Sequence, residues 1–393
     1  MPAEGDLITI DKRLLPLSWL YGIGVGVRNK LFDLGILKSR SFSVPVISVG
    51  NITVGGSGKT PHVEYLVELL KSDAKIAVLS RGYKRKTKGY LLADDHSTVA
   101  DIGDEPYQMH QKYPDIVVAV DEDRCEGIDR LTTDEATQAT DIILLDDAYQ
   151  HRYVKPGINI LLVDYHRLIV YDKLLPAGRL REPVSGKNRA DIVIVTKSPD
   201  TLNPIDYRVV TKDLDLYPYQ TLLFSSIDYA DLRPFNGNAP TRSLSSISSE
   251  ESVLLLTGIA SPQQMENDLR AYSEHITPLT FADHHEFTEE DIATIHQQFA
   301  ALPSPKLIIT TEKDEVRLRA IDGLSDEVKA SLYVLPIKIK FLLDHEETFK
   351  NKILSYVHKN SKNSILIRKK EEDKPKDTQQ DSNRPRTISF RSD

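Results

Sequence analysis

Short runs of β-branched and other apolar residues alternate with longer segments of helical periodicity along most of the chain. Polar residues hardly interrupt these runs, as in strands that are covered on both faces. Strands separated by helical segments favour a mostly parallel sheet flanked by helices, the α/β class. The runs expected to form strands of a first domain cover residues 44–49, 75–79, 116–120, 142–146, 158–163 and 192–196.

A second set of apolar runs predicts a smaller α/β lobe, with strands over residues 253–257, 277–281, 307–311 and 332–337. The end of the chain is too polar to bury a core, so we expect a disordered charged tail there. The expected divisions are an N-terminal segment at 1–40, a first domain at 41–205, a second lobe at 206–355 and the tail at 356–393.

An apolar stretch near the N-terminus, LLPLSWLYGIGVGV at residues 14–27, contains the only tryptophan. It is too short for a membrane-spanning helix, which needs about 20 residues. Acidic residues before it and the lack of a small-residue cleavage site argue against a signal peptide. Two interpretations remain: a helix buried against the domain, or an interfacial helix with Trp19 and Tyr21 at headgroup level and Arg28 and Lys30 near lipid phosphates.

The sequence GNITVGGSGKTP at residues 50–61 lies between the first expected strand and a segment with helical spacing. This is the context of a phosphate-binding loop, although Thr53 stands where the usual pattern has its first glycine. Threonine fits there if its φ is negative. A plain turn would leave the lysine and threonine at the start of the helix to chance. The expected phosphate-binding residues are Thr53, Val54, Gly55, Gly56, Ser57, Gly58, Lys59 and Thr60.

The residue types in this loop suit a nucleotide bound with magnesium. The glycines let backbone N–H groups face phosphate oxygens, Lys59 reaches the β- and γ-phosphates, and Thr60 offers a hydroxyl to Mg²⁺. Asp146 and Asp147 follow a buried strand, and carboxylates at that end of a parallel sheet are placed to reach the ion. No [NT]-K-x-D motif for reading guanine is present, so we expect ATP.

Composition excludes some classes of protein. The chain has 393 residues, enough for two domains, and its single cysteine excludes an internal disulfide and suits a reducing cytoplasm. The net charge of −8 argues against a general nucleic-acid binder.

Beyond these local patterns, the chain resembles the tetraacyldisaccharide 4′-kinase family, the lipid A precursor kinases of Gram-negative bacteria, from residue 14 to about 345. The family's loop has the same Thr-Val-Gly-Gly form, whereas Ala148 stands where the family usually has glycine. The motifs that carry the resemblance are GNITVGGSGKTP (50–61), SRGYKR (80–85), GDEP (103–106), DDAYQH (146–151), LLPAGRLREP (174–183), FADHH (281–285) and TTEKDEVRL (310–318).

The resemblance implies a P-loop NTPase-like fold and transfer of the ATP γ-phosphoryl group to the 4′-hydroxyl of an acylated glucosamine disaccharide 1-phosphate, giving lipid IVA. It implies ATP and Mg²⁺ as cofactors and no required protein partner. Because the substrate lies in a membrane, it also favours the interfacial interpretation of the N-terminal segment. The expected location is peripheral (monotopic), on the cytoplasmic face of the inner membrane.

The resemblance also implies catalytic roles for Lys59, Asp104 and His284. Asp104 matches the family's proposed base, and His284 matches the histidine that pairs with it. A carboxylate with a pKa near 4 is a poor base, and a neighbouring imidazole can share the proton. Without the resemblance, both motifs also fit helix starts, with Asp104 as a cap and a second cap at Thr288.

Metal and substrate contacts complete the expected site. The expected metal partners are Thr60, Asp146, Asp147 and Glu105. The basic run around residue 84 would ordinarily be a solvated loop, but beside a lipid 1-phosphate it becomes a candidate contact. The expected substrate contacts are Arg81, Tyr83, Arg124 and Arg181.

Two other classes stay open: a metallochaperone or regulatory NTPase that acts on a protein partner, and a non-catalytic membrane-associated scaffold. The acidic residues that could serve a hydroxyl acceptor, Asp104 and Asp283 beside His284, favour the kinase.

Overall fold

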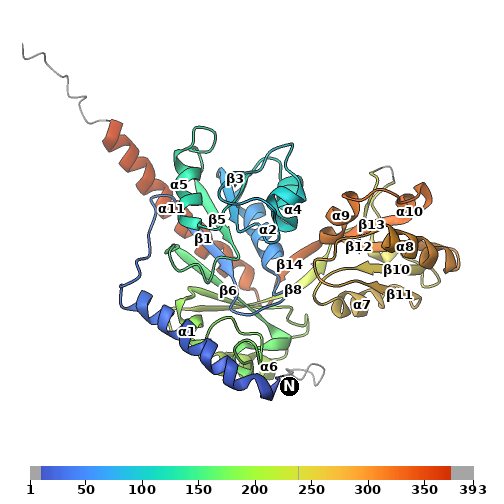
Figure 1. Cartoon of the computed structure of the whole chain (residues 1–393), viewed down its shortest axis with the longest axis horizontal. Helices are drawn as coiled ribbons and strands as arrows, with labels where there is room; N and C mark the ends of the chain where they lie inside the picture. Colours follow the sequence, from blue (N-terminus) through green and yellow to red (C-terminus); the bar gives the residue numbers. More distant parts are fainter. Residues whose placement is uncertain (1–9, 238, 373–393) are drawn as a thin grey trace, which may run out of the picture.

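The computed structural model describes residues 10–237 and 239–372, which form two α/β bodies (Figure 1). Within the described chain, the larger body has a nine-stranded sheet in the order β14-β8-β7-β6-β1-β5-β2-β4-β3. The seven neighbouring strands β8, β7, β6, β1, β5, β2 and β4 pair in parallel, and β14 and β3 are antiparallel strands at the two edges. Its strands are β1 (Val46–Gly50), β2 (Ile76–Ser80), β3 (Leu91–Leu92), β4 (Val117–Val120), β5 (Ile142–Asp146), β6 (Ile158–Asp164), β7 (Ile192–Thr196), β8 (Thr221–Tyr229) and β14 (Ile337–Phe341).

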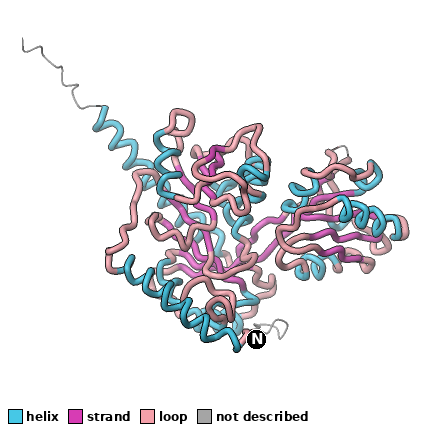
Figure 2. Tube along the Cα trace, viewed as in Figure 1, coloured by secondary structure: helices cyan, strands magenta, loops and turns pink. Residues whose placement is uncertain are grey.

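The smaller body has its own sheet, in the order β11-β10-β12-β13-β9, with only β9 antiparallel. Figure 2 shows this sheet separated from the larger one and joined to it by extended chain. Its strands are β9 (Arg233–Pro234), β10 (Ser252–Thr257), β11 (Ile276–Thr280), β12 (Lys306–Thr311) and β13 (Leu332–Leu335).

Helices cover both sheets. Those of the larger body are α1 (Leu15–Asp33), α2 (Lys59–Leu70), α3 (Val99–Ile102), α4 (Asp104–Lys112), α5 (Arg124–Thr133), α6 (Pro204–Leu214) and α11 (His345–Glu372). Those of the smaller body are α7 (Gln263–Leu269), α8 (Glu289–Ala301), α9 (Glu312–Arg319) and α10 (Asp326–Ser331). Short 3₁₀ helices are η1 (Lys12–Leu14), η2 (Tyr165–Arg167), η3 (Ile169–Tyr171), η4 (Val184–Arg189) and η5 (Leu244–Ser246).

The expected fold class is confirmed, and every strand expected from an apolar run forms with bounds shifted by at most a few residues. The domain boundaries differ from the expected ones. β8 lies beyond the expected limit at 205, yet it pairs with β7, and β14 brings the chain back to the same sheet. The second lobe is therefore an insertion between β8 and β14, narrower than the expected 206–355.

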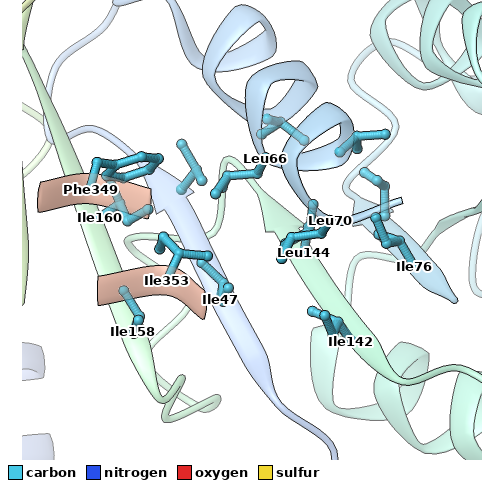
Figure 3. Close-up of a cluster of buried hydrophobic side chains, with 14 of the residues drawn as sticks. Ile47, Leu66, Leu70, Ile76, Ile142, Leu144, Ile158, Ile160, Phe349 and Ile353 are labelled. Carbon is cyan, nitrogen blue, oxygen red and sulfur yellow. The ribbon is translucent and has the colours of Figure 1, made fainter. Parts of the chain in front are cut away.

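The expected tail boundary at 356 falls inside α11. Phe349, Ile353 and Val357 recur every four residues on this helix and are buried in the main core. Figure 3 shows Ile353 beside Ile47 of β1 and Phe349 beside Ile160 of β6, with Leu66 of α2 in the same cluster. This burial orders the first part of the expected tail, and residues 373–393 lie outside the described chain.

The N-terminal helix α1 contacts the larger body along one face only. Ser18 is buried, and its Oγ accepts a hydrogen bond of 2.9 Å from the backbone N–H of Ala177. The opposite face exposes large apolar side chains, with Trp19 73% and Leu20 62% exposed. A fully buried helix is therefore not what the structure shows. In the described part of the chain, no helix combines the length and hydropathy needed to cross a bilayer.

Candidate active site

The glycine-rich loop connects the end of β1 to the start of α2. Gly55 and Gly58 have φ values of 114° and 80°, a region that strains other residues. Thr53 has no positive φ; it forms a β-bridge with Leu180, and the N–H of Val54 donates to the Arg179 carbonyl at 2.8 Å. The opening of the loop is thus held by the segment 174–183, so a glycine is not required at position 53.

His62, in the first turn of α2, connects the end of the loop to the neighbouring strand β8. Its Nδ1 lies 2.7 Å from the Gly58 carbonyl oxygen, and its Nε2 lies 3.1 Å from the Ser225 Oγ. A carbonyl only accepts, so Nδ1 carries the proton and the Ser225 hydroxyl donates to Nε2. Burial lowers the pKa of His62 to about 4, although the hydrogen bond to Gly58 opposes this. The imidazole is therefore neutral and ties the loop to β8.

Two carboxylates meet the loop from the end of β5. Asp146 is buried, and Asp147 Oδ1 lies 3.7 Å from the Lys59 Nζ. One oxygen of each carboxylate, Oδ1, receives no hydrogen bond. Burial, followed by the charges of Glu105 and Asp147, raises the pKa of Asp146 to about 7, against smaller opposing effects of Lys59 and Lys313. Hard oxygen ligands without donors fit a Mg²⁺ ion, and Thr60, which follows Lys59 in the loop, is buried.

Asp104 and His284 come together from different bodies of the protein. His284 Nδ1 lies 2.8 Å from Asp104 Oδ2, and Arg317 Nη2 lies 2.6 Å from the same oxygen. Burial raises the pKa of Asp104, but the hydrogen bonds from His284 and Arg317 outweigh it and hold the pKa below its usual value. Asp104 is therefore ionised and accepts the Nδ1 proton of His284. The pair can take up one proton from a hydroxyl group.

The helix-start interpretations hold only in part. α4 begins at Asp104, but Oδ2 of this residue is engaged by His284 and Arg317 rather than by the helix N-terminus. Thr288 does cap α8, in a capping box with Asp291. His285, rather than His284, bonds to Asp291, at 2.8 Å.

Helix α9 of the smaller body faces α4 across the junction (Figure 1), and two of its cations pair with residues at the start of α4. Arg317 pairs with Asp104, and Lys313 Nζ pairs with Glu105. Both lie in TTEKDEVRL, but no role was predicted for either. Their four-residue spacing on one helical face was the available signal. Glu105, expected near the metal, has Lys313 as its partner and acts on Asp146 through its charge.

The expected substrate residues fall into two groups. Arg181 lies 3.5 Å from Asp147 Oδ2, and buried Arg124 has Asp147 and the exposed Arg81 within electrostatic range. Burial lowers the pKa of Arg124 to about 10, and its Nε has no hydrogen-bond acceptor. Tyr83 lies instead against His284, with ring centroids 5.2 Å apart. Arg181 and Arg124 thus lie near the carboxylates, Arg81 lies within electrostatic range of Arg124, and the tyrosine borders the Asp104–His284 pair.

Two cavities open at the site between the bodies. One is lined by the loop at Lys59 and Thr60 and by apolar residues of the inter-body strands and second lobe, including Tyr229 and Ile259. The other, of about 580 Å³, is lined by Asp104, His284, Tyr83, Tyr107, Phe287 and Val316. The phosphate-binding loop and the proton-accepting pair therefore each face a cavity at the junction of the bodies.

Asp123, Cys125 and His151 form a separate group, with one ligand atom of each within 4.8 Å of the others. Burial, and then the charge of Arg124, lower the pKa of His151 to about 4. The same positive charge opposes a bound cation, so this group does not extend the magnesium site.

Comparisons with known proteins agree with this arrangement. A family profile described as tetraacyldisaccharide-1-P 4′-kinase matches residues 10–358. A tetraacyldisaccharide 4′-kinase of Phocaeicola vulgatus is 57% identical over 362 residues, which cover 92% of this chain and 99% of the relative. One from Bacteroides fragilis is 52% identical over 372 residues, covering 94% and 99%. A crystal structure of LpxK from Aquifex aeolicus in complex with ATP matches with a TM-score of 0.67 and 29% identity, over 88% of this chain and 98% of that chain.

Proposed function

The chain belongs to the tetraacyldisaccharide 4′-kinase family, and we propose that it transfers the γ-phosphoryl group of ATP to the 4′-hydroxyl of a tetraacyldisaccharide 1-phosphate, giving lipid IVA. The single observation that carries this proposal is the junction of the two bodies. A phosphate-binding loop with free carboxylates and a proton-accepting pair meet there, which a binding-only NTPase does not need.

On the donor side, Lys59 and the N–H groups of the loop hold the phosphates in line for transfer. Thr60, Asp146 and Asp147 would hold Mg²⁺, which neutralises phosphate charge when bound. Glu105 is close enough to act on Asp146 electrostatically and is proposed to act beside the ion. The apolar side of the adjoining cavity, at Ile259, suits the adenine ring.

On the acceptor side, the 4′-hydroxyl oxygen forms a bond to the γ-phosphorus while the bond to the β–γ bridging oxygen breaks. ADP leaves with that oxygen, and the hydroxyl proton passes to the Asp104–His284 pair. Arg317 keeps Asp104 ionised at 2.6 Å, so the pair is ready to accept a proton before the substrate enters.

The substrate is proposed to reach the site from the membrane along α1. The Tyr21 hydroxyl on this helix donates at 2.7 Å to the carbonyl of Arg181, whose side chain lies 3.5 Å from Asp147. A lipid held at the exposed face of α1 therefore has its headgroup near the carboxylates. Arg181, with Arg124 and Arg81, would contact its phosphate. ATP is supplied in the cytoplasm, which favours the cytoplasmic face of the inner membrane.

The experiment that tests this function presents the purified protein with Mg-ATP and the disaccharide 1-phosphate lipid in mixed micelles. Mass spectrometry of the lipid should show the addition of one phosphate, and none with the variant Lys59→Ala. A regulatory NTPase that acts on a protein partner would leave the lipid mass unchanged.

A further inference from the structure

Lys313 lies in the first turn of α9, on the side of the smaller body that lines the site. It follows the strand β12 directly, so its backbone is fixed by a helix start whose cap, Thr311, receives the N–H of Asp314 at 3.1 Å. Its side chain is 27% exposed and lines the same cavity as Lys59 and Thr60. A rigid base and a partly open ammonium group allow this lysine to act on a ligand in the cavity.

The surroundings of Lys313 are strongly acidic. Its Nζ pairs with Glu105, and its charge also interacts with Asp104 and Asp283. It lowers the proton affinity of Asp146, together with Lys59. Lys313 therefore stands between the carboxylates at the end of β5 and the Asp104–His284 pair. In the proposed reaction, the γ-phosphoryl group passes through this space.

On the donor side, the phosphate-binding loop supplies Lys59, in the first turn of α2. Phosphoryl transfer spreads negative charge over three equatorial oxygens, and a further cation opposite the loop stabilises that charge. Arg317 is the other cation that α9 brings to the site, but it is committed to Asp104 and Asp314, at 2.6 and 3.0 Å. Lys313 has the flexible stem needed to exchange one oxyanion for another.

We propose that Lys313 is a catalytic residue supplied by the second lobe, whose ammonium leaves Glu105 and contacts the γ-phosphoryl oxygens during transfer. This inference rests on the proposed kinase function. Lys313 gives no proton and forms no covalent bond; it stabilises charge while the phosphorus–oxygen bonds exchange. Its release also frees Glu105 to act beside the metal.

The competing explanation is that Lys313 only joins the two bodies. Lys112 provides a matched control, because its Nζ also bridges the bodies, from α4 to Glu312 of α9 at 2.8 Å, and lies outside the lining of the cavity. A purely structural role predicts similar losses for Lys313→Met and Lys112→Met. A catalytic role predicts a loss of turnover that is specific to Lys313.

The test compares wild type, Lys313→Met, Lys313→Arg and Lys112→Met in the lipid phosphorylation assay. We expect Lys313→Met to lower kcat by about 10²–10³-fold with little change in the KM for ATP. Lys313→Arg should recover part of the loss, and Lys112→Met should stay within about tenfold of wild type. Lys313→Met should also weaken binding of Mg·ADP with aluminium fluoride, a mimic of the transferring group, far more than binding of Mg·ADP.

The outcomes separate the two levels of inference. A wild-type protein that leaves the lipid unphosphorylated would overturn the proposed function itself. An active wild type with Lys313→Met close to it, or with equal losses for Lys313→Met and Lys112→Met, would overturn the role of Lys313 alone. If Lys313→Met weakened the binding of Mg·ADP equally with and without aluminium fluoride, that result would also overturn the role of Lys313.

Discussion

Individual side chains in this kinase are held by groups of opposite charge drawn from distant parts of the chain. Lys59 is held less tightly: its Nζ lies 3.7 Å from Asp147 Oδ1, an oxygen that receives no hydrogen bond. Lys59→Ala should therefore leave the fold intact and lower kcat by about 10²-fold or more. Lys71→Ala, at the exposed end of the same helix, is the matched control. Turnover near wild type in Lys59→Ala would remove the loop from the chemistry.

The Asp104–His284 pair should behave as one unit. Asp104→Asn and His284→Gln should each lower kcat by about 10²–10⁴-fold, the usual contribution of a general base. The double variant should be little worse than the poorer single variant, because the residues share one proton. Asp291→Asn, at the neighbouring helix cap, should lower stability by about 1 kcal/mol and keep turnover. Losses that multiply in the double variant would contradict a shared role.

His62 should make stability depend on pH. Its folded pKa of about 4 lies below the ordinary value of 6.5, so below pH 6.5 the unfolded chain takes up a proton that the folded protein refuses. Stability is therefore lost as pH falls from 6.5 toward 4, by about 2 kcal/mol at pH 5. His62→Gln lacks this loss, so denaturant titrations should show the difference between the two proteins shrinking by that amount between pH 7.5 and 5. A constant difference would contradict a buried neutral imidazole.

Among the elements, α1 combines a contacting face with an exposed apolar one. Trp19→Ser with Leu20→Ser removes two large apolar side chains that are 73% and 62% exposed. Liposome binding should fall by about tenfold or more, since burying each such side chain in lipid is worth about 1.5–3 kcal/mol. The melting temperature of the double variant should stay close to that of the wild type. Ile205→Ser on α6, which is 71% exposed, is the control. Unchanged binding in the double variant would exclude α1 as the anchor.

Elements that carry a clear pattern of their own in the sequence were predicted. Uninterrupted apolar runs predicted the parallel strands, and the glycine loop predicted the start of α2. β14 was missed because its sequence IKIKF alternates polar and apolar residues at the edge of a sheet. α11 was missed because Phe349, Ile353 and Val357, though spaced every four residues, stand in an otherwise mostly polar stretch.

At the scale of the whole molecule, sheet membership is set by tertiary pairing, which no local pattern encodes. The return of β8 and β14 to the first sheet was therefore not predictable, and the second lobe was assigned too many residues. The site residues likewise divide into those that a local pattern predicts and those that depend on long-range contacts. Asp146 follows its strand directly and was predicted, whereas Arg317 meets Asp104 across 213 residues of sequence. The acceptor side is built from residues of both bodies, so neither body's sequence pattern alone defines it.

The central claim is that this junction directs phosphate to one hydroxyl of a lipid. The most direct measurement is phosphorus–proton correlation NMR of the purified product made by the wild-type protein from Mg-ATP and the disaccharide 1-phosphate. The account predicts a second phosphorus signal that correlates with the proton at the 4′ carbon. ATP consumed without a phosphorylated lipid, or phosphate attached at another position, would contradict it.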